Sequence, residues 1–260
     1  MAESIMKDKL RLAAVGDIHC TKNSQGLLQS WLNLVAEQAD ILLLLGDLTD
    51  YGTPEEARVL TRELSTFRLP VVTVLGNHDF ESAQQDEVAK ILTDSGVSVL
   101  DGDTVEIHGV GFVGVKGFAG GFGRRALAPW GEPIIKQFVH EGIEEALKLE
   151  SAIGRLRTPT KVVLLHYAPI HETVVGEPDE IVPFLGSTRL EEVIDRYRAN
   201  VVFHGHAHHG SPEGRTKTGI PVFNVAMPLM KKMNAAAPFK VYEIETGVET
   251  AGQQSVAASA

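Results

Sequence analysis

Three apolar segments in the first third of the chain each end at a glycine that precedes polar, metal-capable side chains. These glycines and the polar residues after them are Gly16-Asp17, Gly46-Asp47 and Gly76-Asn77. Helical patterns separate the segments, and strands that alternate with helices form a largely parallel sheet through right-handed crossovers. The carboxyl ends of parallel strands lie at one edge of such a sheet, where ligands bind. The pattern therefore predicts an α/β fold with one site that gathers the three polar stretches.

Local signals in the same region support this alternation of strands and helices. Residues 41–45 are apolar on both faces, as expected of a strand that is covered on both sides. Residues 26–38 carry an apolar stripe at helical spacing. Thr53-Pro54-Glu55-Glu56 is a capping box with proline at the first helical position, and it predicts a helix that ends near Thr66.

The rest of the chain carries further helix and strand patterns and no linker that would divide it. The sequence Thr188-x-x-Glu191 indicates a second capping box at the start of a helix. The other expected elements are a helix at 87–95, short strands at 97–100, 105–107 and 109–115 in a more antiparallel section, a long helix at 133–156 with charged residues outward, and strands at 161–165, 201–203, 220–225 and 239–244. We expect a single domain over residues 1–260, with its core at about 10–246 and a disordered tail at 247–260.

Composition excludes several classes of protein. The net charge of −10 argues against a broad electrostatic grip on nucleic acid, so no extended nucleic-acid surface is expected. No apolar run is long enough to span a bilayer, and the N-terminus lacks the apolar core of a signal peptide. The single cysteine allows no internal disulfide, and we therefore expect a cytoplasmic location.

A second concentration of metal-capable side chains lies late in the chain. The strand at 201–203 leads into His204-Gly205-His206-Ala207-His208-His209, and imidazole is the commonest protein ligand for transition metals. Together with the other strand ends, the candidate ligands are Asp17, His19, Asp47, Asn77, His166, His206 and His208. A purely structural role as turn and cap residues would have to hold seven times independently. The mixed nitrogen and oxygen donors suit Mn, Fe, Zn, Co or Ni better than Mg or Ca.

The order of these residues resembles the calcineurin-like metallophosphoesterase superfamily. Five blocks, Asp-x-His, Gly-Asp-x-x-Asp, Gly-Asn-His-Asp, His and Gly-His-x-His, occur in that order from Asp17 to His208. The resemblance implies a two-sheet β-sandwich flanked by helices, with a dinuclear metal site at the edge where the loops meet. It also implies a division of the ligands: Asp17, His19 and His208 for one metal ion, Asn77, His166 and His206 for the other, and Asp47 as the bridge between them.

The resemblance further implies a catalytic pair, His78 and Asp50. His78 would contact the scissile phosphate and assist the leaving group, while Asp50 would hold it. A carboxylate can fix the tautomer of an imidazole and favour its protonated form, although a purely structural hydrogen bond is the alternative. Two departures, Tyr51 in place of an arginine and Asp79 in place of a glutamate, disfavour the protein Ser/Thr phosphatase branch.

These features lead us to expect a phosphodiesterase that uses metal-activated hydroxide for in-line attack at phosphorus, with a small phosphate ester such as a nucleotide as substrate. Manganese is the favoured metal, with Fe, Zn and Ni as alternatives. A small-molecule phosphomonoesterase or a nucleotide pyrophosphatase would use the same site. A scaffold that retains the fold without chemistry is disfavoured, because every ligand position and His78 are intact.

Two loops are candidates for substrate selection. The glycine-rich loop at 117–131 contains Arg124 and Arg125, which can grip phosphate, and its glycines allow close backbone approach. A solvated loop before a helix is the alternative. The second loop is at 171–187, and its acidic part from Glu172 to Pro183 is a candidate lid or oligomer contact, again with a plain loop as the alternative.

Overall fold

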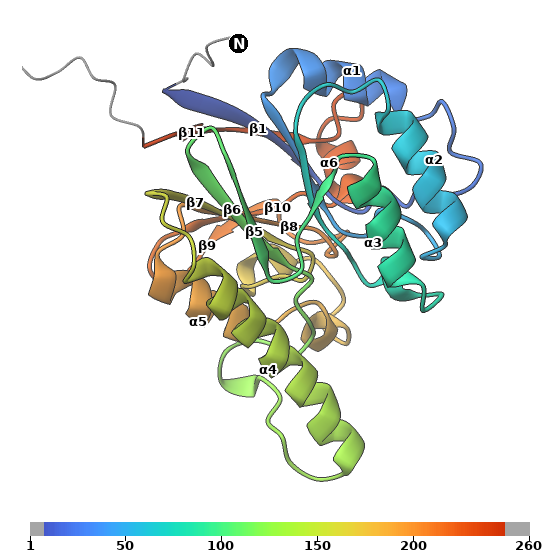
Figure 1. Ribbon diagram of the computed structural model, residues 1–260. Coiled ribbons are helices and arrows are strands. Elements are labelled where there is room, and N and C mark those ends of the chain that lie inside the picture. The colour runs from blue at the N-terminus through green and yellow to red at the C-terminus, as the bar shows by residue number, and fades with distance from the viewer. Residues whose placement is uncertain (1–7, 248–260) are drawn as a thin grey trace, which may run out of the picture.

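The computed structural model describes residues 8–247, and these form two β-sheets packed face to face and flanked by helices (Figure 1). The predicted α/β two-sheet architecture is confirmed. The predicted disordered tail lies, apart from Gly247, outside the described residues.

The first sheet has five strands in the order β11-β1-β2-β3-β4. Its strands are β1 (Lys9–Val15), β2 (Ile41–Leu45), β3 (Val71–Val74), β4 (Ser98–Val99) and β11 (Lys240–Glu245). The first four run parallel, and β11 pairs antiparallel with β1 at the edge. The ends of β1, β2 and β3 therefore lie side by side, as their sequence pattern predicts.

The second sheet has six strands in the order β5-β6-β7-β8-β10-β9. Its strands are β5 (Asp103–Ile107), β6 (Val110–Val115), β7 (Thr160–Leu165), β8 (Val201–His204), β10 (Pro221–Asn224) and β9 (Glu213–Arg215). The four central strands are parallel, and β5 and β9 are antiparallel edges. This arrangement brings the residues that follow β7 and β8 to a common edge as well.

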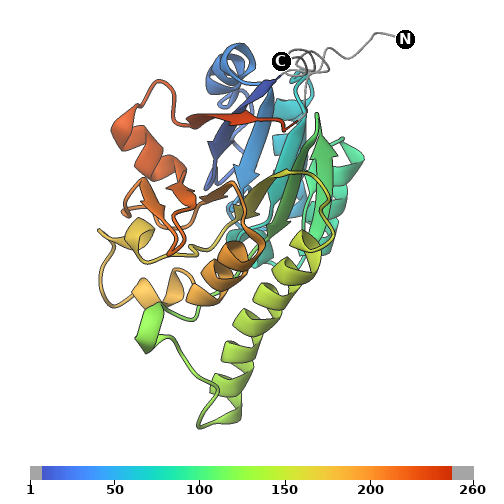
Figure 2. The ribbon, with the colours of Figure 1, turned by 90° about the vertical axis from the view of Figure 1, so that its left-hand side faces the viewer.

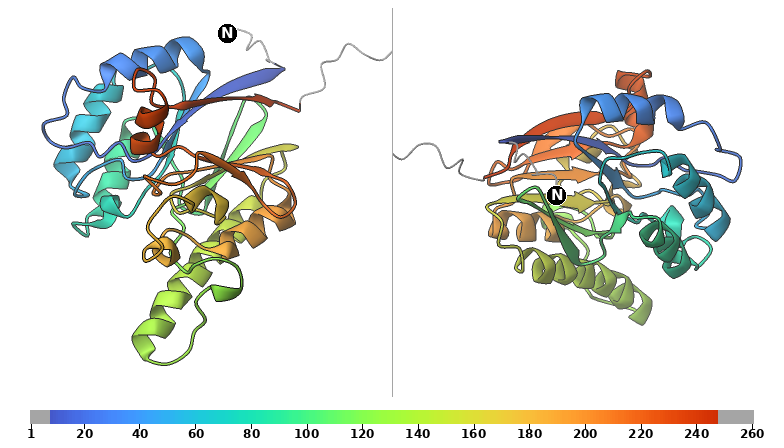
Figure 3. Two further views of the ribbon diagram at one scale, coloured as in Figure 1. Left: turned by 180° about the vertical axis from the view of Figure 1, so that it is seen from behind. Right: turned by 45° about the horizontal axis from the view of Figure 1, so that its top comes forward.

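Helices cover the outer face of each sheet (Figure 3). Helices α1 (Gln29–Gln38), α2 (Pro54–Leu64), α3 (Gln85–Asp94) and α6 (Met227–Met233) lie with the first sheet. Helices α4 (Pro133–Ile153) and α5 (Thr188–Tyr197) pack on the second. The N-terminal turns of α4 extend beyond the strands (Figure 2).

Strand β2 shows why its sequence is apolar throughout. Leu42 and Leu44 belong to the core between the first sheet and its helices, whereas Ile41, Leu43 and Leu45 belong to the core between the two sheets. Successive side chains of a strand point to opposite faces, so a strand that is covered on both faces needs apolar residues at every position.

Most predicted elements occur within a few residues of their expected ends, and the capping box at Thr53 and Glu56 is present. The second predicted capping box is wrong. Ser187 caps α5 through Arg189 N, whereas Glu191 instead accepts hydrogen bonds from the main chain and the ammonium of Lys217. A capping box requires the glutamate to fold back on its own helix, and here a cation from another loop binds it.

Two further expectations are corrected. The section at 97–115 is only partly antiparallel, because β4 runs parallel to β3 and β6 runs parallel to β7, which leaves β5 with β6 as the antiparallel pair. The charged residues of α4 are not all outward, since Glu145 is buried and accepts a hydrogen bond from Gly117 N at 2.7 Å. Helix α6 and strand β9 were not expected from the sequence.

Among the described residues, no helix combines the length and apolar character that crossing a membrane requires.

The packing between the sheets predicts a large effect of truncation at Leu43. This side chain is fully buried between the sheets, so Leu43→Ala should lower the free energy of unfolding by about 2–5 kcal/mol through lost burial and a residual cavity. Leu27→Ala is the control, because Leu27 is 67% exposed and its loss should change stability by less than about 0.5 kcal/mol. Urea unfolding measures both, and equal effects would contradict this assignment of the core.

Candidate metal centre

The loops after β1 and β2 continue the parallel sheet beyond the strands. Asp17 N donates to Gly46 O, His19 N to Asp47 O and Cys20 N to Leu48 O, each at 2.9 Å. Main-chain hydrogen bonds therefore hold the two polar stretches in register. The side chains of Asp17, His19 and Asp47 are fixed on a rigid frame rather than carried on free loops.

Four of the predicted ligands lie on strained backbone. Asp17, His19, Asp47 and His206 have φ angles of 56°, 48°, 47° and 70°. This left-handed region is uncommon for residues with a Cβ, and such conformations persist where the surrounding structure enforces them, often at functional sites. All four residues belong to groups of donor atoms that could hold a metal ion.

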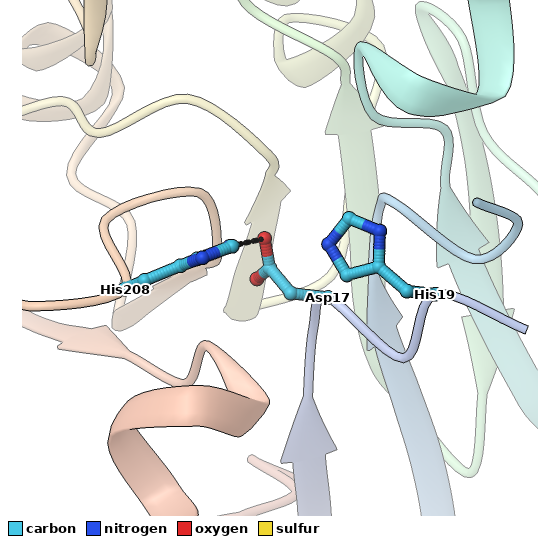
Figure 4. A group of neighbouring side chains, drawn as sticks. All are labelled: Asp17, His19 and His208. Atoms are coloured by element: carbon cyan, nitrogen blue, oxygen red, sulfur yellow. Dashed lines mark hydrogen bonds and ion pairs between the residues drawn. The ribbon is translucent and has the colours of Figure 1, made fainter. Parts of the chain in front are cut away.

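The first group of potential ligands contains Asp17, His19 and His208, whose donor atoms lie within 4.8 Å of one another (Figure 4). His208 Nε2 is 2.9 Å from Asp17 Oδ1. Both oxygens of the buried Asp17 carboxylate also accept from His206 N, at 3.1 and 3.0 Å. The hydrogen bond to the Asp17 carboxylate raises the pKa of His208.

The second group contains Asp47, His166 and His206, again with donor atoms within 4.8 Å. Asn77 Oδ1 lies 2.9 Å from His166 Nε2, which adds the amide to this group. His166 Nδ1 donates to the main-chain carbonyl of Leu45 at 2.8 Å. That hydrogen bond fixes the tautomer and leaves Nε2 facing the site, as is usual for metal-binding histidines.

Asp47 contacts both groups. Its Oδ2 lies 3.8 Å from His19 Nε2, and its Oδ1 lies 3.3 Å from His166 Nε2. Burial alone would raise the pKa of Asp47, but the charge and hydrogen bonds of His166 and the main-chain N–H of His78 hold it below its ordinary value. Burial likewise opposes protonation of His166, and the Asp47 carboxylate outweighs it and raises the pKa of His166.

His78 and Asp50 lie together, but not through the expected contact. His78 Nδ1 donates to the main-chain carbonyl of Asp50 at 2.8 Å, whereas the Asp50 carboxylate lies 3.2 Å from His19 Nδ1. The backbone therefore orients His78, and the carboxylate faces one of the predicted metal ligands. His19, Asp50 and His78 form a third cluster of donor atoms within 4.8 Å.

Glycines allow the strand ends to approach this closely. A Cβ on Gly76 would lie 2.2 Å from Asp47 N and from Asp47 Oδ1, and a Cβ on Gly205 would lie 2.4 Å from Asp17 Oδ2. Both distances are far below contact distance. The glycines that precede the polar residues are thus needed for the ligands to meet. This requirement explains why these strands in the sequence end at a glycine.

Asp79 is a site residue for which the sequence pattern indicates no role. Its fully buried carboxylate accepts from Gly76 N at 2.8 Å, Leu48 N at 3.2 Å, and the main chain and hydroxyl of Thr49 at 2.9 and 2.6 Å. It therefore ties the loop that carries Asp47 to the loop that carries Asn77. Its position in the motif was visible, but the loop contacts depend on tertiary structure.

Both ring nitrogens of His204 have partners within the protein, so His204 is not a free metal ligand. Its ring is fully buried, Nδ1 donates to Gly205 O at 2.8 Å, and Nε2 lies 2.8 Å from the Thr173 hydroxyl. Burial lowers its pKa to about 4, so it is neutral at ordinary pH. His204 links the ligand loop after β8 to the segment at 171–187. His209, by contrast, is exposed.

The two arginines of the glycine-rich loop are both exposed, in a 3-10 turn at Gly123–Arg125. Neither lines the pocket beside Asn77. A role for Arg124 and Arg125 in substrate binding stays a prediction.

The donor set fits transition-metal ions. Within the described part of the chain, the predicted ligands lie in the clusters above, and His19 Nδ1 is buried without a hydrogen-bond partner despite its nearness to Asp50. Because Nδ1 faces Asp50, Nε2 on the Asp47 side of the ring is the His19 atom that would bind a metal ion. Imidazole, carboxylate and amide together suit Mn, Fe, Zn or Ni.

Comparison with known proteins assigns the family. Residues 10–210 match the calcineurin-like phosphoesterases. The chain belongs to this family. It is accordingly a phosphoric ester hydrolase of a metal-dependent family, and the geometry above describes its candidate metal centre.

Relatives support the same assignment. A Synechococcus protein named "Probable cyclic nucleotide phosphodiesterase" is 24% identical over 225 residues, which cover 80% of this chain and 77% of that protein. The phosphopantetheinyl hydrolase of Mycobacterium tuberculosis shares the fold with a TM-score of 0.63 at 16% identity, over 90% of this chain and 96% of the other. The protein TT1561 of Thermus thermophilus has a TM-score of 0.53 at 17% identity, over 91% of this chain and 99% of the other.

The contacts of Asp79 predict that Asp79→Asn weakens the frame of the metal centre. The amide would turn an N–H₂ group toward main-chain donors, and leaving such a buried donor unpaired costs about 1–3 kcal/mol. We expect the free energy of unfolding to fall by that amount in urea and the affinity for Mn²⁺ to fall with it. Asp94→Asn is the control, because the Asp94 ion pair with Lys90 is exposed. An Asp79→Asn protein as stable as the control would contradict the role given to this carboxylate.

Proposed function

We propose that the chain is a dinuclear metal-dependent phosphodiesterase. The observation that supports this best is the position of Asp47, whose two carboxylate oxygens face different ligand groups. A carboxylate between two sets of imidazole and oxygen donors is the arrangement that a pair of metal ions requires.

The residues divide between the two ions as follows. Asp17, His19 and His208 would hold one ion, Asn77, His166 and His206 would hold the other, and Asp47 would serve both. When bound, two such ions supply Lewis-acid activation of water and neutralise charge on the phosphoryl group. The nitrogen-rich set favours Mn, with Fe, Zn and Ni as alternatives.

His78 is the residue of this chain that acts on the leaving group. Its Nδ1–H is committed to the Asp50 carbonyl, so His78 must be an imidazolium to act as the acid, with Nε2–H giving its proton to the departing oxygen. Its main-chain N–H donates to Asp47 Oδ1 at 2.8 Å, which fixes its position relative to the bridging carboxylate. Proton transfer from a group held at two points requires little reorganisation.

A diester is preferred over a monoester for two reasons. Tyr51 and Asp79 depart from the protein Ser/Thr phosphatases, and the Synechococcus relative is named as a cyclic nucleotide phosphodiesterase. The substrate we propose is a small phosphate ester.

Metal content tests the division of ligands. The wild-type protein should bind two Mn²⁺ per chain, and His208→Ala should lose one of them because it removes a ligand of a single group. Asp47→Ala should lose both or bind both weakly. His140→Ala is the matched control on the exposed face of α4 and should retain two. Elemental analysis after dialysis measures these ratios, and one ion per wild-type chain would reject the dinuclear assignment.

Hydrolysis tests the reaction. Metal-stripped protein should be inactive, and added Mn²⁺ should restore cleavage of bis-p-nitrophenyl phosphate at a higher kcat/KM than p-nitrophenyl phosphate. Asn77→Ala should lower kcat/KM by at least about 100-fold, since even outer partners of metal ligands cost up to that factor. Faster cleavage of the monoester would favour a phosphomonoesterase instead, and no turnover with two bound ions would favour a scaffold.

A further inference from the structure

A pocket of about 450 Å³ opens beside the metal centre. It is lined by Asn77, Phe80, Lys116, Phe118, Ile134, Gln137, Phe138, Glu141 and Tyr167. Its volume is within the range of small-molecule sites, and its lining is mainly apolar with a few polar groups, as such sites usually are.

One wall of the pocket is a single face of α4. Ile134, Gln137, Phe138 and Glu141 are spaced by three or four residues and so lie on the same side of the helix. The helix is held against the sheet in part by Glu145, which accepts from Gly117 N. The wall is therefore carried by a rigid element rather than by a loop.

Another part of the lining is an aromatic cluster around one ammonium group, and it adjoins the α4 face because the rings of Phe118 and Phe138 are 5.0 Å apart. Lys116 Nζ lies 5.3 Å from the ring centre of Phe80, 5.0 Å from that of Phe118 and 5.4 Å from that of Tyr167. A cation over aromatic rings at this distance is attracted to them. These ring contacts hold the Lys116 ammonium in the lining of the pocket.

The polar atoms in the pocket have hydrogen-bonding capacity to spare. An ammonium carries three donors, and within the described residues that of Lys116 makes a single hydrogen bond, to Gly117 O at 2.9 Å, and no ion pair. The Tyr167 hydroxyl makes no hydrogen bond to any described residue. Both groups can therefore donate to an acceptor on a bound molecule.

The pocket is continuous with the metal centre. Asn77 lines the pocket and lies 2.9 Å from His166 Nε2. The ring of Tyr167 packs against the ring of His206, with 4.4 Å between their centres. A substrate with its phosphate at the metal ions would therefore place an attached organic group in the pocket.

We propose that this pocket binds the organic group of the phosphate ester, and that the group is aromatic and carries a hydrogen-bond acceptor that Lys116 recognises. The rings of Phe118 and Tyr167 supply stacking surfaces, and the ammonium supplies the donor. This inference rests on the proposed function, because it requires a phosphate ester at the metal centre. It makes Lys116 a specificity residue and the α4 face a boundary of the substrate site.

Binding of three phosphonates to the Mn²⁺-loaded protein tests the proposal by calorimetry. Methylphosphonate probes the metal centre alone, phenylphosphonate adds a ring, and 4-carboxyphenylphosphonate adds an acceptor. The wild-type affinity should rise in that order. Lys116→Met should weaken 4-carboxyphenylphosphonate by about tenfold or more, the value of a hydrogen bond to a charged group, and leave methylphosphonate within about twofold.

Two further variants complete the test. Phe118→Leu keeps an apolar side chain but removes the ring, and it should weaken both aryl phosphonates by about threefold to tenfold. Lys136→Met is the matched control on the same helix outside the pocket. Retained binding of methylphosphonate shows that each variant is folded.

The outcomes separate this proposal from the proposed function. Equal affinity of the wild type for methyl and aryl phosphonates, or an equal loss of all three in Lys116→Met, would overturn the pocket as the site of the organic group. If no phosphonate bound to the Mn²⁺-loaded wild type, the proposed function would itself fail. Selective loss of the aryl ligands in the pocket variants alone would support the assignment.

Discussion

The structure depends on how closely the ends of its parallel strands approach one another. The loops after β1, β2 and β3 pack so tightly that a methyl group at Gly76 would overlap the backbone and carboxylate of Asp47. Two features maintain this approach: main-chain hydrogen bonds that join the loops to one another, and the buried Asp79 carboxylate, which accepts from Leu48 N and Gly76 N. Every other feature of the metal centre follows, because short side chains such as Asp17, Asp47 and Asn77 reach a common point only if their backbones are already close.

Electrostatic interactions set the protonation of the same site. Two buried carboxylates face several imidazoles at its centre, and the contacts push the pKa of Asp47 down and that of His166 up. Burial lowers the pKa of His206 to about 3, so this ring is neutral and can serve as a ligand. Asp47 and His206 are thus held in their deprotonated forms, whereas His166 and His208 would release protons to a bound cation.

The sequence predicts the fold class and the ligand cluster because both depend on patterns that short segments of the sequence contain. Strands that stop at glycine can be recognised one at a time, and their parallel order then places Asp17, Asp47 and Asn77 together. Contacts that join distant segments could not be predicted in this way. The backbone carbonyl that orients His78, the cation that binds Glu191 and the aromatic cluster around Lys116 depend on which loops meet in three dimensions. The sequence does not predict helix α6, because the helix has only seven residues and no side chain that caps its N-terminus.

The separation of the ligands along the chain has a consequence for biosynthesis. Asp17 and His208 meet across 191 residues, and β1 gains its outer neighbour only when β11 is present. Pairings of such long range form slowly and late. During translation, β1 therefore has no antiparallel partner, and its edge stays exposed, until nearly all of the described chain has left the ribosome. The nascent chain is therefore most exposed to aggregation in this interval, before the metal centre has formed.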